Sequence, residues 1–305
     1  MRSHKINIIP SHQIDLTKWD DCILKSDNGF IYATSSYLNA MTDDWYGLIM
    51  NDYKTIMPLP CRKKLGINYL YTAPFMQQLG LIGDEDINPN AVIIALQTFA
   101  KYGDYFFNFK NSFIESYDSV KNYNNFILDL SVDYKNILNN YSTNLQRNLK
   151  KAQSENIEYF ISEDIQQTLK LHQRLQSKNI LHVTSHDYDR FENLCFLEKE
   201  KEQCFVRQVK NKSGEILSAA ILLKDNRRIY NIINATTHEG KNSNANHFLM
   251  DKIIQEFAGK NLLFDFEGSN IAGVQNFYEM FGTLNQPYFH WHYNKLPFPL
   301  KLFKR

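Results

Sequence analysis

The sequence predicts an α/β protein whose mixed sheets are divided between two domains. Its 305 residues are enough for about two domains of ordinary size. Short runs of alternating apolar and polar residues, typical of strands, recur between segments in which apolar residues have helical spacing. The last third carries three strand-like runs joined by tight turns, followed by helix, strand and helix. This pattern divides the chain near residue 130, into residues 1–130 and residues 131–305.

The composition is that of a globular protein without a strong overall field. Hydrophobic residues make up 43% of the chain, and 34 basic against 33 acidic side chains give a net charge of +1. This balance excludes a whole-protein attraction to nucleic acid or to an anionic membrane, and leaves only local patches. The N-terminus lacks the features of a signal peptide, and no stretch reaches the ~18 apolar residues of a membrane span. We therefore expect a cytoplasmic protein with no membrane span.

The four cysteines are scattered and form no C-x-x-C motif, which is typical of free thiols in a reducing compartment. They are Cys22, Cys61, Cys195 and Cys204.

The first domain is expected to begin with a short strand at KINII and to combine strands with helices. Proline is favoured at the start of a helix, so Pro89 predicts the start of one, and Gly103 is its expected end. The expected ranges are a helix over 16–26, aromatic-rich segments over 31–41, strands over 45–51, 54–62 and 68–72, a helix over 91–102 and a strand over 105–109.

The middle of the chain is expected to contain a basic amphipathic helix. In the segment STNLQRNLKKAQ, Leu145, Leu149 and Ala152 fall on one side of a helical wheel. Arg147, Lys150 and Lys151 fall on the opposite side, where they could grip a phosphate-bearing substrate or simply face solvent. The expected elements are a strand over 126–130, helical segments over 134–153, a strand over 157–161 and helices over 165–176 and 188–201.

The last third has the clearest pattern, an antiparallel meander of three strands. Turns at Lys212-Ser213-Gly214 and at Asp225-Asn226 separate the strands. The expected elements are strands over 204–210, 215–224 and 229–235, a polar loop, a helix over 247–258 ended by Gly259, a strand over 262–267 and a helix over 274–280 ended by Gly282.

The stretch FDFEGS at residues 264–269 places two carboxylates on one strand face. Side chains alternate across a strand, so Asp265 and Glu267 share one face, roughly 7 Å apart, while Phe264 and Phe266 share the other. A carboxylate that faces a low-dielectric cleft has a raised pKa and can act as a general base. Glu267 is the better placed, at the carboxyl end of the strand. Pairing with a Lys or Arg on a neighbouring strand would explain the two acids equally well.

The end of the chain resembles the GNAT acyltransferase fold. Tyr278-Glu-Met-Phe-Gly282 is similar to the Y-x-x-x-G that closes the last long helix of GNAT enzymes, and the polar loop before residue 247 lies where those enzymes bind the cofactor pyrophosphate. FDFEGS followed by FYEMFG, the upstream RNLKKA, and IMPLP and PFMQQLG in the first domain resemble tandem-GNAT proteins. These include the Fem-like peptidoglycan aminoacyltransferases and related bacterial N-acetyltransferases. The resemblance implies two GNAT-like domains, the first of them degenerate.

The resemblance also implies roles for individual residues. Tyr278 would protonate the departing thiolate, although a helix-borne aromatic residue is otherwise ordinary core. The strand residues Asn231, Ile233, Asn234 and Ala235 would lie along the pantetheine chain. The usual phosphate loop, Q/R-x-x-G-x-G/A, is absent, and the nearest frame contains Lys241, Asn244, Ala245 and Asn246. Asparagine tolerates the left-handed conformation better than most residues, so these asparagines could replace glycines in an anion-binding loop.

These features predict transfer of an acyl group from acyl-CoA to a primary amine of a small-molecule or peptidoglycan-precursor acceptor. Aminoacyl-tRNA is the alternative donor, and a non-catalytic binding protein is the alternative class. We expect no metal, because His182-x-x-x-His186 lacks a Glu beside the first His, and His290-Trp-His292 lacks a further ligand. The sequence indicates no oligomeric state.

Overall fold

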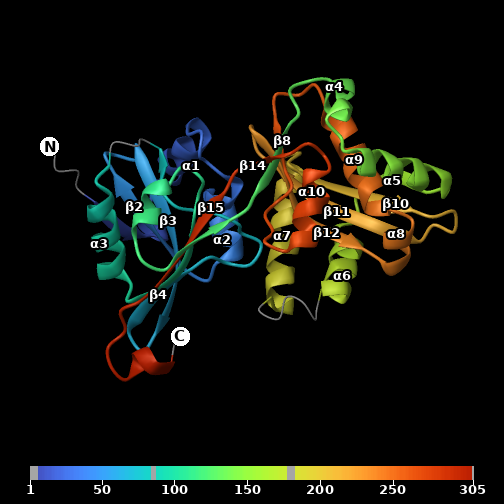
Figure 1. Ribbon diagram of the computed structural model, residues 1–305. Coiled ribbons are helices and arrows are strands. Elements are labelled where there is room, and N and C mark those ends of the chain that lie inside the picture. Colours follow the sequence, from blue (N-terminus) through green and yellow to red (C-terminus); the bar gives the residue numbers. More distant parts are fainter. Residues whose placement is uncertain (1–5, 84–86, 177–182, 304–305) are drawn as a thin grey trace. The chain divides into compact units, whose positions relative to one another are not determined.

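The computed structural model describes residues 6–83, 87–176 and 183–303, and these form two compact units (Figure 1). The first unit consists of residues 1–123 and 287–305, and the second of residues 124–286. This division differs from the predicted boundary near residue 130, because the last residues return to the first unit. They do so because β15 (Tyr288–Asn294) pairs with two strands of the first sheet.

The first unit contains a mixed sheet of eight strands among the described residues. Its strand order is β1-β2-β3-β4-β6-β15-β7, with β5 paired to β3. The strands are β1 (Asn7–Pro10), β2 (Trp45–Met50), β3 (Thr55–Lys64), β4 (Ile67–Tyr71), β5 (Ile82–Gly83), β6 (Tyr102–Phe107) and β7 (Val120–Tyr123), together with β15. The predicted strand at KINII corresponds to β1, and its first residue, Lys5, lies outside the described residues.

Two helices of the first unit begin where the sequence predicts, at Leu16 and at Pro89, and a further helix lies within the segment 31–41, which the sequence marks only as rich in aromatic residues. They are α1 (Leu16–Lys25), α2 (Ser35–Met41) and α3 (Pro89–Phe99), with short 3-10 turns between elements. The prediction that Gly103 ends the third helix is wrong, because α3 ends at Phe99 and Gly103 lies within β6. A Cβ atom at Gly103 would lie 2.1 Å from the ring of Tyr293, so this glycine makes room for a ring.

The second unit contains a seven-stranded sheet among the described residues, in the order β14-β8-β13-β12-β11-β10-β9. Its strands are β8 (Phe126–Asp129), β9 (Glu158–Ser162), β10 (Cys204–Lys210), β11 (Ile216–Lys224), β12 (Arg228–Thr236), β13 (Leu263–Asp265) and β14 (Leu284–Asn285). Strands β10, β11 and β12 pair antiparallel in sequence order, so the predicted meander is confirmed.

Helices cover both faces of the second sheet (Figure 1). On one face α9 packs on β10 and β11 and is itself covered by α5, while on the other face α6 packs on β11 and β12. The helices are α4 (Tyr134–Asn139), α5 (Thr143–Ser154), α6 (Ile165–Gln176), α7 (Ser185–Glu200), α8 (His238–Asn242), α9 (Ala245–Phe257) and α10 (Ala272–Glu279). The buried side of α5 consists of Leu145, Leu149 and Ala152, as its wheel predicts.

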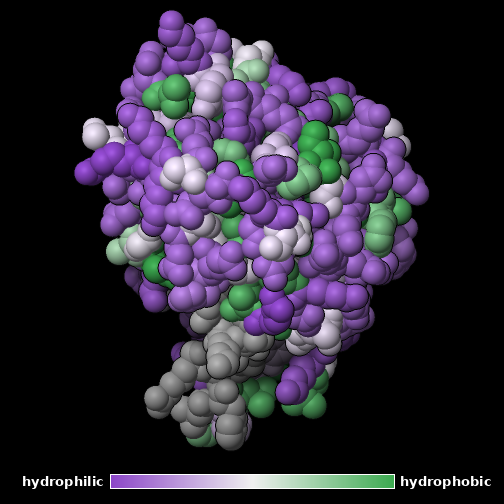
Figure 2. All heavy atoms as spheres, turned by 90° about the vertical axis from the view of Figure 1, so that its right-hand side faces the viewer, coloured by the Kyte–Doolittle hydropathy of each residue, from purple (hydrophilic) through white to green (hydrophobic). Residues whose placement is uncertain are grey.

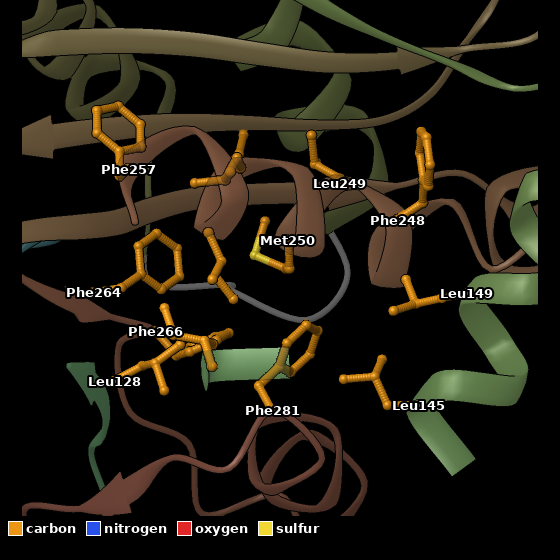
Figure 3. Close-up of a cluster of buried hydrophobic side chains, with 14 of the residues drawn as sticks. Leu128, Leu145, Leu149, Phe248, Leu249, Met250, Phe257, Phe264, Phe266 and Phe281 are labelled. Atoms are coloured by element: carbon orange, nitrogen blue, oxygen red, sulfur yellow. The ribbon is translucent and has the colours of Figure 1, made fainter. Parts of the chain in front are cut away.

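An aromatic core joins β13 to the helices of the second unit (Figure 3). Phe264 and Phe266 are both fully buried, and their ring centroids lie 4.7 Å apart. Phe281 follows α10 and contacts Phe266, with ring centroids 5.3 Å apart. The apolar face predicted for the FDFEGS stretch is therefore confirmed, and it anchors the strand beside which the candidate site lies.

Candidate active site

The candidate site lies where two parallel strands of the second unit separate. Strands β12 and β13 pair over three positions, from Arg228 opposite Leu263 to Tyr230 opposite Asp265. Strand β12 continues to Thr236, paired over this stretch with β11, whereas β13 ends at Asp265. Parallel strands that stop pairing leave backbone N–H and C=O groups along one edge, which an extended ligand can use.

Strand β12 is irregular at the point of separation. Tyr230 lies opposite Leu223 and Ile233 opposite Ile221, so two residues of β12 face one residue of β11, which is a β-bulge. Asn231 is one of the bulged residues. Its side-chain Oδ1 is buried and has no hydrogen-bond partner among the described residues. A buried amide oxygen without a donor is costly, so a ligand N–H at this position would be stabilised.

The other predicted strand residues lie on the same stretch of β12. Ile233 and Ala235 are buried, and Ala235 packs with Leu171 of α6. Asn234 is partly buried and points its amide toward Met250 of α9. Asn231, Asn234 and Thr236 are therefore the polar residues in the stretch of β12 beyond its pairing with β13, and the other residues of that stretch are apolar.

Asp265 is an internal anchor and not an exposed base. Its side chain is 1% exposed and forms an ion pair with Arg228, with 2.9 Å between Oδ2 and the guanidinium nitrogen. Asn125 donates a second hydrogen bond to the same oxygen, at 3.2 Å. Burial raises the pKa of the Asp265 carboxyl, and the adjacent guanidinium opposes that shift. Of the two readings that the sequence leaves open, pairing with a cation describes Asp265.

Glu267 has left the strand and is held in an uncommon backbone conformation. Its φ angle is +64°, in the left-handed region that side-chain-bearing residues seldom adopt. Its N–H donates to Oδ1 of Asp265 at 3.0 Å, so the buried acid fixes the backbone of the second acid. The expectation that both acids share one strand face therefore differs from the structure, in which the chain turns after Phe266. Local strain of this kind is common at functional sites.

Tyr278 of α10 lies near both acids. It packs against Phe126 and Phe266, with ring centroids 5.7 Å and 5.1 Å away. Burial, followed by the negative charges of Glu267 and Asp265, raises the pKa of the Tyr278 phenol. The phenol therefore stays protonated at neutral pH and can donate a hydrogen bond. The structure thus brings together the three residues that the sequence predicts as catalytic.

The predicted anion-binding loop contains a short helix, α8, between β12 and α9. Asn244 follows it with φ +54° and ψ +31°, so an asparagine does occupy the left-handed position where a glycine would be usual. Helix α9 starts at the next residue, Ala245, without a side-chain cap, so the backbone N–H groups of its first turn point out of the helix end. Such a helix start favours negatively charged groups.

Some of the side chains around the start of α9 form hydrogen bonds with neighbouring elements. Asn246 accepts a hydrogen bond from Ser218 of β11 at 3.3 Å. Lys241 is exposed on α8. Lys151 of α5 donates to the backbone oxygen of Asn242 at 2.8 Å, so one of the three predicted basic residues contacts the segment that precedes α9.

Arg147 and Lys150 are exposed on the outer side of α5. Figure 2 views the molecule from the side on which α5 and α8 lie in Figure 1, and this surface is mainly hydrophilic with small, separated hydrophobic areas. A solvated basic face and a phosphate-binding face both fit this arrangement.

The sequence interpretation missed two residues that shape the site. Arg228 holds Asp265 and also donates to Gln286 at 2.8 Å. His247 lies in the first turn of α9, beside Phe277 of α10, and its Nε2 is 3.3 Å from the amide of Asn148. Burial lowers the pKa of His247 to about 4, so its imidazole is neutral at physiological pH. Arg228 could be picked out from the sequence only if the parallel pairing of β12 with β13 were already known, because its partner Asp265 lies on β13.

Comparison with solved structures identifies the fold. FemX has a TM-score of 0.64 and 14% identity, with 98% of this chain and 99% of that chain covered. A tandem GNAT protein from the clavulanic acid biosynthesis pathway has a TM-score of 0.57 and 8% identity, over 96% of this chain and 99% of that chain. The chain folds as two GNAT-like domains in tandem.

The chain is also similar in structure to the C-terminal domain of a putative lysylphosphatidylglycerol synthetase from Agrobacterium fabrum. That domain has a TM-score of 0.56 and 12% identity, over 95% of this chain and 94% of that chain. No protein-family model matches the sequence, and no curated protein matches it. In the second GNAT-like domain, β12 and β13 are the strands that separate.

Two further observations concern the described residues only. No helix among them is both long and apolar enough to cross a membrane. No three of their His, Cys, Asp or Glu side chains gather in a way that could hold a metal ion. His182 lies outside the described residues, so its predicted lack of a metal partner is not tested.

Proposed function

We propose that the protein is an N-acyltransferase that moves an acyl group from acyl-CoA to a primary amine. The observation that carries this proposal is the separation of β12 from β13 after three paired positions, with Glu267 and Tyr278 beside that opening. An extended thioester donor fits an unpaired strand edge, because its amides can pair with backbone groups as another strand would. The Oδ1 of Asn231, for which the described part of the chain offers no hydrogen-bond donor, supports this fit, since an amide N–H of the acyl donor would satisfy it.

The proposed reaction is a direct transfer without a covalent enzyme intermediate. The amine nitrogen attacks the thioester carbonyl carbon, forming the C–N bond, and the C–S bond breaks as the thiolate leaves. Glu267 accepts a proton from the attacking amine, directly or through water, and Tyr278 donates a proton to the departing sulfur. Solvent then returns both side chains to their starting states. Asp265 acts as a positioning residue, because it holds the N–H of Glu267.

The start of α9 is the proposed site for the pyrophosphate of the donor. Its uncapped first turn and the left-handed Asn244 support this assignment, and Lys241 and Lys151 lie on neighbouring elements. For the acceptor, the likeness to FemX and to the Agrobacterium fabrum domain supports an amine on a cell-envelope precursor.

Aminoacyl-tRNA is the second candidate donor. The exposed cations of α5 and the likeness to FemX favour it. The two donors differ in salt dependence, because a protein that neutralises several phosphates of a nucleic acid releases counterions and loses affinity steeply as salt rises.

Thermal unfolding of the full chain with each donor separates the candidates. A donor that binds only the folded state raises the melting temperature. We expect a shift with acetyl-CoA or a longer acyl-CoA that survives moderate salt. A shift with charged tRNA alone, lost at moderate salt, would favour the second donor. If no donor shifts the transition, the chain is better described as a binding protein on a transferase fold.

Substitution of the two proposed catalytic residues tests their roles. Glu267→Gln and Tyr278→Phe should each slow transfer by about 10²-fold or more, the usual contribution of general acid–base catalysis. Neither should change the melting temperature by more than a few degrees. Glu279→Gln, on the exposed side of the same helix as Tyr278, is the matched control and should keep full activity. Wild-type rates in both test variants would remove the proposed roles.

A further inference from the structure

Strand β9 forms one edge of the second sheet, and its outer side has no pairing partner in the part of the chain that the structure describes. It is the last strand in the order of that sheet and pairs there only with β10. None of its residues, Glu158–Ser162, is buried, whereas most residues of β10 are. The free backbone N–H and C=O groups of such an edge can pair with a strand from another chain.

Two apolar side chains of β9 are exposed at this edge. Phe160 is 38% exposed and Ile161 is 70% exposed, so neither belongs to the core. Lys210 of β10 covers part of the Phe160 ring, with Nζ 5.2 Å from the ring centroid. The strand therefore presents both unpaired backbone groups and apolar side chains.

The end of α7 extends this apolar area. Phe196 is exposed there and lies three residues before Lys199, and residues at this spacing share one face of a helix. Lys199 forms an ion pair with Glu163, directly after β9, at 3.2 Å, and it lines a cavity of about 160 Å³ together with Ile161. Apolar surface that gathers in this way on a folded domain is typical of an interaction site.

The other outer strands of the two sheets carry features that hinder pairing. Strand β1 contains Pro10, which lacks an N–H, β7 carries the charged side chain of Lys121, and β14 has only two residues. Strand β9 contains no proline and no lysine, and its one charged residue, Glu158, is at its first position. Among these outer strands, β9 is the one suited to accept a further strand.

We propose that β9 pairs with β9 of a second copy of the chain, antiparallel and around a two-fold axis at Phe160. In this register Phe160 lies opposite the same residue of the second copy. Tyr159 lies opposite Ile161, and Glu158 lies opposite Ser162. Aromatic and β-branched side chains then pair with each other and no like charges are opposed, which favours strand pairing. Because the same surface is used by both copies, the assembly closes as a dimer.

The neighbouring two-fold registers are less complementary. An axis at Tyr159 would place Glu158 opposite Phe160, and an axis at Ile161 would place Glu163 opposite Tyr159. Each of these registers puts a carboxylate against an aromatic ring, where it loses water without gaining a hydrogen bond. The side chains therefore select the axis at Phe160.

The pairing leaves the proposed donor opening free. In the strand order, β10 and β11 lie between β9 and β12, so the edge is about 14 Å from β12 at the usual spacing of strands. The dimer does not depend on the transfer reaction, and its disruption should not change the rate of transfer.

Sedimentation velocity of the full chain over a range of concentrations tests the association. A contact of one short strand and a small apolar area is at the low end of specific interfaces, so we expect a monomer–dimer equilibrium at micromolar concentrations. Phe160→Glu should weaken association by about 10-fold or more, because it places two carboxylates opposite each other on the axis. The new carboxylate lies near Lys210 of its own chain, so the variant should fold, which its melting temperature checks. Ile94→Glu, at an exposed apolar position on α3, is the control and should associate as the wild type does.

Cysteine cross-linking tests the register. Residues directly opposite in antiparallel strands have Cα atoms about 4.5–5.5 Å apart, within the range of a disulfide. Phe160→Cys should therefore form a covalent dimer under mild oxidation. Ile161→Cys is the control, because its side chain is more exposed but its two copies are diagonal neighbours about 7–8 Å apart, and it should cross-link far more slowly. The four native cysteines are buried and should not contribute.

Three results would each overturn the proposal. The chain could remain monomeric at the highest concentration at which it stays soluble, which would leave the edge to water or to another protein. Phe160→Glu could associate as tightly as the wild type, which would place the contact on a different surface. The two cysteine variants could cross-link at the same rate, which would mean that chance collisions and not strand pairing bring the copies together.

Discussion

The buried ion pair between Arg228 and Asp265 holds the backbone of the nearby residue Glu267 in place. Each side chain is at most 5% exposed, and Asn125 and Gln286 satisfy further hydrogen bonds of the pair. Removing one partner would leave an uncompensated charge in the interior, which is strongly destabilising. The pair therefore fixes the side chain of Asp265. That side chain accepts a hydrogen bond from the N–H of Glu267 and so fixes the backbone of Glu267.

We expect Arg228→Met to lower the free energy of unfolding by about 3–5 kcal/mol, the usual cost of breaking a buried pair. Urea unfolding measures this change. Arg62→Met is the matched control, because Arg62 pairs with Asp43 at 3.8 Å in an exposed position and should cost less than about 1 kcal/mol. Equal losses in the two variants would contradict the assigned role of Arg228.

Two histidines, His172 in the interior and His247 at a partly buried position, predict a loss of stability in mild acid. Burial lowers the pKa of both His172 and His247 to about 4. In the unfolded chain the pKa of a histidine is about 6.5. Between pH 6.5 and 4 each of these histidines is therefore protonated in the unfolded state and neutral in the folded state. Stability is complete above pH 6.5 and falls as the pH drops through this window.

The slope of stability against pH measures this effect. Each histidine should contribute about 1.4 kcal/mol per pH unit within the window. His172→Gln should flatten the slope between pH 6.5 and 4 by about this amount, whereas His238→Gln, at an exposed position, should leave it unchanged. An unaltered slope in His172→Gln would mean that another group controls the acid transition.

At the scale of elements, the sequence predicts most strands and helices of the second domain but not how they end. Helix α5 and the meander follow from side-chain periodicity, which is a local property. The end of β13 does not follow from local periodicity. The backbone of Glu267 is held by Asp265, which is itself paired with Arg228 of β12. Strands β14 and β15 escape prediction because their partners lie more than a hundred residues away. For the candidate site, the sequence predicts Glu267 from its place at the end of a strand and Tyr278 from the resemblance, but it misses Arg228.

The junction between α8 and α9 depends on one left-handed residue. A side chain other than Gly, Asn or Asp costs about 1–2 kcal/mol in this conformation. We therefore expect Asn244→Ala to lower the free energy of unfolding by about 1 kcal/mol, while Asn244→Gly leaves it unchanged or raises it. Chemical unfolding of the two variants side by side measures the difference. If both variants lose the same stability, the side chain of Asn244, and not its backbone, maintains the junction.

At the scale of the whole molecule, the chain path makes the two domains unequal. The second domain is one continuous segment, residues 124–286, and its seven described strands all lie within it. The first domain needs residues from both ends of the chain. Strand β15 lies between β6 and β7 in the first sheet, so the last residues supply an interior strand and not an edge.

Truncation after Gln286 should therefore unfold the first domain and spare the second. Without β15, β6 and β7 lose their shared partner, and the buried rings of Trp291 and Tyr293 leave the core. Hydrogen exchange should show loss of protection in β6 and retained protection in β10, β11 and β12, because only the first sheet is opened. Truncation after Leu296 keeps β15 and should retain protection in both sheets. If β6 stays protected in the shorter chain, the first sheet is stable without its interior strand, and the division of the chain into a continuous and a discontinuous domain has little energetic meaning.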